Sequence, residues 1–189
     1  MSPRDPSNDN EVIEAADVGP ESPVVDGFDE DDGVTGESVI DRVVAFRLAG
    51  QLYGLPIDVV REIQQLAELL PLPDDDPALV GLIEIRGAVV PVLDLRALVG
   101  LEHAAYTLET PMVFCRVGTH DVCLIVDSVD DVVDLPPGGI QPPSAVYALA
   151  DKMLGTVKLE QGVLMLLDIE RLVPAAALSA AETIEVVER

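Results

Sequence analysis

Basic and aromatic residues are scarce in this chain. Its 189 residues include 11 Lys and Arg against 35 Asp and Glu, a formal net charge of −24, with no Trp and only 3% aromatics. Nucleic-acid binding and attachment to anionic membranes both depend on clustered positive charge, so this balance argues against both. Hydrophobic residues make up 49% of the chain, so the core must be built from Val, Leu, Ile and Ala.

Long apolar segments and metal-ligand motifs are also missing. No apolar run approaches the ~18 residues of a membrane helix, and the N-terminus lacks the pattern of a secretory signal, so we expect a cytoplasmic location. Cys115 and Cys123 flank a short turn, which favours two buried thiols over a redox pair. With only two histidines and no Cys-x-x-Cys motif, we expect no metal and no cofactor.

Sequence motifs of catalysis are absent as well. There is no Gly-x-Ser-x-Gly elbow, no phosphate-binding glycine loop and no dinucleotide fingerprint. The acidic stretch DSVDDVVD (127–134) carries four carboxylates, but their spacing does not match a calcium loop. An acidic strand end accounts for this stretch, with a catalytic carboxylate pair as the alternative. We expect a protein that is not an enzyme.

The chain divides into three zones by composition. Residues 1–41 hold 13 acidic residues and one basic residue, which predicts a disordered tail because too little apolar surface can be buried. Residues 42–174 read as many short strands separated by Gly- and Pro-rich turns, which predicts a mainly β domain. Residues 175–189 follow a proline with strong helix formers, which predicts a helical tail.

An internal repeat organises the β domain. GLIEIRGAVVPVLDLRALV (81–99) aligns without gaps on GTVKLEQGVLMLLDIERLV (155–173), and a second match lies upstream at an offset of 69 residues. Each copy reads as strand, tight turn, strand and a helical turn opened by an aspartate, Asp94 or Asp168. Because both copies have this aspartate, helix capping explains it. The repeat predicts two copies of one unit of about five strands, arranged as paired small barrels.

One pair of charges does not follow the repeat. Glu84 and Arg86 interrupt an apolar strand, and the alternation of side chains along a strand predicts that both point to one face. Their counterparts in the second copy are Lys158 and Glu160. The pair therefore belongs to one unit only, which favours a functional role over shared architecture.

The order of these motifs resembles the CheW family of chemotaxis coupling proteins. Across residues 42–174 the resemblance rests on GQLYGLPIDVVREI, VGLIEIRGAVVPVLDLRALVG, CLIVDSVDDVVDL and GTVKLEQGVLMLLDIERLV. It implies two intertwined five-stranded barrels of SH3-like fold with short helices and a C-terminal helix. It also implies a scaffold without catalytic activity that bridges chemoreceptor cytoplasmic tips to the regulatory domain of the histidine kinase CheA. The alternative is a CheW-like module recruited to another pathway, such as twitching motility driven by type IV pili or polar array organisation.

The resemblance also implies which residues bind these partners. Val60 and Glu62 match positions tied to receptor and kinase coupling, Gly81 matches a glycine at a close backbone approach, and Arg86 matches the signature arginine. The family usually has Asn at the position of Glu84, so this carboxylate is a departure within the same surface.

We hypothesise that Arg86 pairs with Glu62 across neighbouring strands, because an unpaired charge at the end of an apolar strand is costly. We also expect an apolar groove between the barrels, formed by the strands of residues 55–63 and 81–93, to accept the helical hairpin of a receptor tip.

Overall fold

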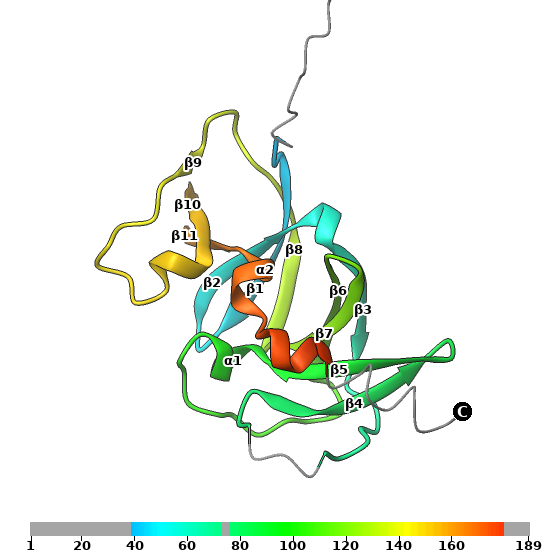
Figure 1. Cartoon of the computed structure of the whole chain (residues 1–189). Helices are drawn as coiled ribbons and strands as arrows, with labels where there is room; N and C mark the ends of the chain where they lie inside the picture. Colours follow the sequence, from blue (N-terminus) through cyan, green and yellow to red (C-terminus); the bar gives the residue numbers. More distant parts are fainter. Residues whose placement is uncertain (1–38, 73–75, 180–189) are drawn as a thin grey trace, which may run out of the picture. The chain divides into compact units, whose positions relative to one another are not determined.

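The computed structural model describes residues 39–72 and 76–179, which form two β-sheets with a few short helices (Figure 1). One sheet has the strand order β8-β1-β2-β11-β10-β9 and the other the order β3-β6-β7-β5-β4. The strands are β1 (Arg42–Leu48), β2 (Gln51–Pro56), β3 (Val60–Gln65), β4 (Leu79–Ile85), β5 (Ala88–Asp94), β6 (Pro111–Val117), β7 (His120–Ile125), β8 (Ser128–Asp134), β9 (Ile140–Gln141), β10 (Met153–Leu159) and β11 (Gly162–Leu167).

The helices of the described residues are all short. Helix α1 (Leu95–Leu98) follows β5, and α2 (Ile169–Leu172) follows β11, while η1 (Ile57–Val59) and η2 (Ala150–Lys152) are 3-10 turns. Asp94 accepts a hydrogen bond from the backbone N–H of Arg96, and Asp168 accepts from two N–H groups at the start of α2. Residues 175–179 are helical, and the rest of the predicted C-terminal helix lies outside the described residues, as does most of the predicted acidic tail.

The strands repeat at the two offsets that the sequence contains. When 69 is added to the residue numbers of β1 and β2, the bounds of β6 and β7 result. The same offset applied to β3 predicts a strand within one residue of the observed start of β8. Strand β4 and helix α1 coincide with β10 and α2 at an offset of 74. The predicted architecture of two equivalent five-stranded units is therefore correct, with the two-residue strand β9 added to one sheet.

The two units exchange strands. Strands β1 and β2 of the first unit join β8, β10 and β11 of the second, and β6 and β7 of the second join β3, β4 and β5 of the first. Four pairs make the exchange, of which β2 with β11 and β5 with β7 are parallel, and β1 with β8 and β3 with β6 are antiparallel. The barrels are intertwined, so no single point in the chain separates one barrel from the other.

Three apolar clusters hold this arrangement together. A cluster around Leu164 and Leu166 lies among the strands of the first sheet, and one around Val92 and Met112 lies among those of the second. The largest cluster joins residues of both sheets, including Phe46 and Leu93, each 0% exposed. Each barrel therefore has its own interior, and a shared core joins the two.

The cysteines belong to this packing. Both thiols are free and buried, and burial raises the pKa of the Cys115 thiol to about 12. Cys115 packs in the shared core and Cys123 in the interior of one barrel, so they lie on opposite faces of the β6–β7 pair. This geometry excludes a disulfide between them, because side chains on opposite faces of a sheet point apart. No helix in the described part of the chain is long and apolar enough to cross a membrane.

Candidate partner-binding groove

The β4–β5 hairpin brings Arg86 to the surface. Arg86 and Gly87 form the two-residue turn, with φ angles of +53° and +80°. Such turns place both central residues in the left-handed region, which a residue other than glycine occupies at some cost. The expectation that Arg86 and Glu84 share a strand face is therefore wrong, because Arg86 lies in the turn and Glu84 in β4.

Arg86 contacts Glu62 across the seam of one barrel. Arg86 Nη2 lies 3.0 Å from Glu62 Oε2, and the second oxygen of Glu62 accepts a hydrogen bond from the side chain of Gln64. Strands β3 and β4 are the two edges of their sheet rather than hydrogen-bonded neighbours, so the expected geometry of this pair needs correction.

The physical reason given for the pair also needs correction. The Arg86 side chain is 80% exposed, so avoidance of a buried charge does not explain the contact. An ion pair this exposed contributes about 0–1 kcal/mol to stability. The pair therefore bridges the two edge strands across the seam but contributes little to stability.

The other three residues implied by the resemblance have different surroundings. Val60 is half-buried and packs against the shared core, whereas Glu84 is exposed and makes no hydrogen bond or ion pair within the described residues. Gly81 lies where another segment crosses β4, and a Cβ atom there would be 2.7 Å from the backbone oxygen of Leu70. The equivalent Gly155 has the same crowding, with Gln141 O at 2.5 Å, which gives Gly81 a structural reason to be glycine.

A groove of about 400 Å³ opens at the seam. Its lining consists of Arg61, Glu62, Ile85, Arg86, Ala88, Val90, Phe114, Arg116 and Asp121. All these residues come from the strands of one barrel or the turn between them, so the expected groove between the barrels is not what the structure shows. The groove has an apolar floor, since Phe114 and Val90 are buried, and a charged rim.

Three of these lining residues, Phe114, Arg116 and Asp121, lie outside the segments 55–63 and 81–93 that were expected to form a groove. Arg61 lies within them but was not singled out. The Nε atom of Arg116 lies 2.8 Å from Asp121 Oδ1, but this buried nitrogen lacks a hydrogen bond of good geometry. The aligned repeats could have pointed to Arg61, because this basic residue corresponds to an acidic one, Asp130, at the offset of 69.

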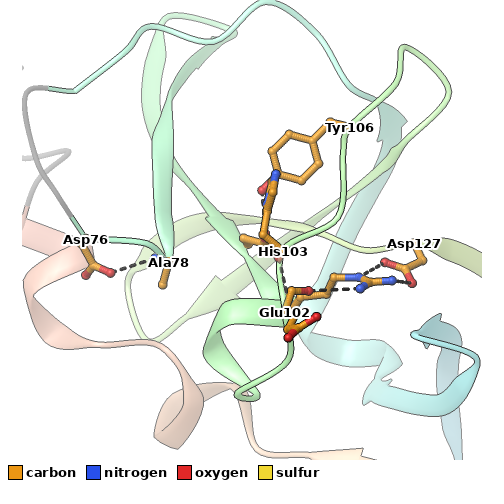
Figure 2. Close-up of polar contacts among 8 residues, drawn as sticks. Asp76, Ala78, Glu102, His103, Tyr106 and Asp127 are labelled. Atoms are coloured by element: carbon orange, nitrogen blue, oxygen red, sulfur yellow. Dashed lines mark hydrogen bonds and ion pairs between the residues drawn. The ribbon is translucent and has the colours of Figure 1, made fainter.

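A second polar cluster lies at the end of β5, around the buried carboxylate of Asp94. Figure 2 labels its members His103 and Tyr106. Tyr106 donates its hydroxyl to Asp94 Oδ2 at 2.6 Å, and His103 Nδ1 lies 3.2 Å from the same oxygen. Burial and then this hydrogen bond raise the pKa of the Tyr106 hydroxyl above its usual value. Asp94 therefore does more than cap α1, because it also fixes the loop that precedes β6.

Arg96 and Asp127 extend this cluster toward the other sheet. Arg96 donates two hydrogen bonds to Asp127, from Nε at 2.6 Å and Nη2 at 2.5 Å, and a third to the carbonyl of Glu102 (Figure 2). Asp127 also accepts from the backbone N–H of Ala49 at 2.7 Å. The hydrogen bond from Arg96 is the main reason why the pKa of Asp127 is lowered. Asp127 thus ties α1, which follows a strand of one sheet, to the β1–β2 turn of the other.

The described residues contain no group of three or more His, Cys, Asp or Glu side chains placed to hold a metal ion. The acidic stretch at 127–134 forms β8 and the residue before it, where Asp130 pairs with Arg47 at 2.9 Å.

Comparison with known proteins identifies the family. The model of the CheW-like domain matches residues 42–177. The chain is 28% identical over 153 residues to the chemotaxis protein CheW of Klebsiella aerogenes, covering 80% of this chain and 92% of that protein. It is 28% identical over 142 residues to the chemotaxis protein CheW of Rhizobium meliloti, covering 74% and 92%.

A solved structure has the same fold. The scaffolding protein TtCheW from Thermoanaerobacter tengcongensis superimposes with a TM-score of 0.67 at 24% identity, covering 76% of this chain and 94% of that one. The family model spans the whole β domain, and the chain belongs to the CheW-like domain family.

Proposed function

We propose that the protein is a non-catalytic coupling scaffold of chemotaxis-type signalling, which links the cytoplasmic tips of chemoreceptors to a CheA-type histidine kinase. The match to the CheW-like domain over residues 42–177 carries this proposal. The relatives named chemotaxis protein CheW support it, since they match over most of their own length.

The groove at the seam is the proposed partner-binding surface. Glu62 and Arg86 lie on its two sides and are paired at 3.0 Å. Val60 lies on β3 and Glu84 on β4, the two strands that border the groove. The Arg86 guanidinium has five N–H groups and donates only one of them to Glu62, so the others remain available to a partner. A rim of this kind selects a partner by charge and geometry, while the apolar floor supplies contact area.

Coupling by such a scaffold requires that binding at one surface affects another. The shared core and the Arg96–Asp127 contact connect the two barrels, so a shift at one barrel is passed to the other through packed groups. Coupling free energies between sites are typically ~1–3 kcal/mol, which is within reach of small rearrangements of these contacts.

Affinity capture with chemoreceptor cytoplasmic fragments and with the kinase regulatory domain tests the proposal. We expect the wild-type protein to retain both, and Arg86→Ala to weaken at least one interaction by about fivefold or more. Arg171→Ala is the matched control, because Arg171 is also an exposed arginine, 64% exposed and paired at 3.1 Å with Asp168.

Circular dichroism should show that both variants are folded. Unchanged binding of a folded Arg86→Ala variant would remove Arg86 from the surface. Failure of the wild-type protein to bind either fragment would favour recruitment of the domain to another pathway, such as type IV pilus motility.

A further inference from the structure

The seam groove carries an excess of positive charge in a strongly acidic protein. Three arginines line it, Arg61, Arg86 and Arg116, against two carboxylates, Glu62 and Asp121. The whole chain has a net charge of −24 and only 11 basic residues. This local reversal of sign is the feature that needs an explanation.

The other barrel shows what the same positions do when they are balanced. Arg116 corresponds to Arg47, and Arg61 to Asp130, at the offset of 69. In that barrel Arg47 Nε donates to Asp130 Oδ2 at 2.9 Å, across the β1–β8 pair. The two barrels are therefore equivalent in backbone but not in charge.

The local backbone is the same in both barrels. Strand β8 has an irregularity opposite Val44 and Phe46, and β3 has one between Val60 and Glu62, where Arg61 lies. The barrel that contains the groove thus has the same bulge and the same strand arginine, Arg116. At the position of the acidic partner Asp130, however, it has a second arginine, Arg61. Asp130 therefore has no counterpart at the equivalent position, and Arg116 pairs instead with Asp121 of β7 at 2.8 Å.

The arginines of the groove have unused donors. Arg61 is exposed and makes no hydrogen bond or ion pair within the described residues. Arg116 pairs with Asp121 and donates from Nη1 to Thr119 O, but its buried Nε lacks a hydrogen bond of good geometry. Arg86 corresponds to Glu160 in the other barrel, so a second acidic position has become basic as well. Guanidinium groups with free donors, above an apolar floor that includes Phe114, are suited to a carboxylate on an apolar segment.

We propose that the seam groove binds an acidic, apolar segment of a partner protein, with a carboxylate of that segment taking the place between Arg61 and Arg116 that Asp130 has beside Arg47. The inference rests on the proposed scaffold function and names the chemistry of the partner at that site. A basic segment is disfavoured by the three arginines of the rim, and an uncharged one leaves their donors unsatisfied.

The decisive variant is Arg61→Asp, which copies the other barrel. Aspartate at this position removes the unpaired arginine and gives Arg116 a second internal carboxylate beside Asp121, so the fold should keep its stability while the site for an external carboxylate is lost. Lys158→Asp is the matched control, because Lys158 is an exposed strand residue outside the groove and the change in net charge is the same.

The probe is a fluorescent seven-residue peptide of alternating leucine and glutamate, compared with a leucine–lysine peptide of the same length. We expect the full-length protein to bind the glutamate peptide at least tenfold more tightly, although its net charge repels that peptide. Arg61→Asp should weaken the glutamate peptide about tenfold, equivalent to ~1.4 kcal/mol, and Lys158→Asp less than twofold. The affinity of the wild-type protein should also fall as salt is raised.

Several outcomes would overturn the inference. These are equal affinity for the two peptides, no effect of Arg61→Asp in a folded protein, or equal effects of Arg61→Asp and Lys158→Asp. Capture of receptor and kinase fragments is measured on the same samples. Loss of fragment binding with intact peptide selectivity contradicts the scaffold function, and the reverse result contradicts the acidic-segment inference alone.

Discussion

Replacement of Asp127 by asparagine should destabilise the protein by about 2–3 kcal/mol. The carboxylate accepts two hydrogen bonds from Arg96, at 2.6 and 2.5 Å, and one from the N–H of Ala49 at 2.7 Å. Asparagine keeps an acceptor but loses the charge, and the Arg96 side chain, only 18% exposed, is left without its counter-charge. Breaking a fully buried pair costs ~3–5 kcal/mol, and the partial exposure of Asp127 lowers this figure.

Urea denaturation of Asp127→Asn, with Asp121→Asn as the control, measures this loss. Asp121 is 43% exposed and pairs with Arg116, so its replacement should cost about 0–1 kcal/mol. At ~2–4 °C per kcal/mol for a protein of this size, Asp127→Asn should also lower the Tm by about 4–12 °C. Equal losses in the two variants would refute the account of Asp127 as the link between the sheets.

The same contact predicts a pH dependence. Because Arg96 holds the pKa of Asp127 below its usual range, the folded state keeps this group ionised to lower pH than the unfolded chain does. Its contribution is therefore complete above the unfolded pKa of ~3.9 and is lost as the pH falls through the folded pKa. The stability difference between wild type and Asp127→Asn should stay constant from about pH 7 to 5 and shrink below about pH 4. A difference that grows on acidification contradicts this reasoning.

Three further predictions follow from the packing and the surface. Gly81→Ala should destabilise the fold by about 1–3 kcal/mol in urea denaturation, since its Cβ would lie 2.7 Å from Leu70 O, and a neutral effect would contradict the crowding at β4. Burial and a pKa of about 12 for Cys115 predict that Ellman's reagent labels this thiol only on unfolding, whereas rapid native labelling would show an open core. Arg86→Ala should change the unfolding free energy by less than ~1 kcal/mol, and a larger loss would mean that the exposed pair is structural.

The strands could be predicted because two kinds of pattern agreed. Alternating apolar residues and the tight turn marked each hairpin, and the repeat at an offset of 74 residues matched β4, β5 and α1 to β10, β11 and α2. The exchange of strands could not be derived in this way. A repeat shows which segments are equivalent, but it does not show which strands pair. From sequence alone β2 could pair with β5 of its own unit or with β11 of the other, and packing in three dimensions selects β11.

The candidate site was predictable in part. Family resemblance pointed to Glu62 and Arg86, but not to the seam that separates their strands, because sheet order is not visible in a local motif. Asp94 was explained as a helix cap, yet its contact with Tyr106 comes from a loop without any periodic pattern. The role of Arg61 could have been found by comparing charges between the repeats, since the backbone equivalence was already evident.

The most direct test of the central claim is whether one molecule of the protein binds a chemoreceptor cytoplasmic fragment and the regulatory domain of a CheA-type kinase together. Sedimentation velocity of the three-component mixture measures this with the full-length chain. The scaffold account predicts a ternary complex that is heavier than either binary complex and that weakens with Arg86→Ala but not with Arg171→Ala. Binding of neither component, or competition between the two for the same surface, would contradict it.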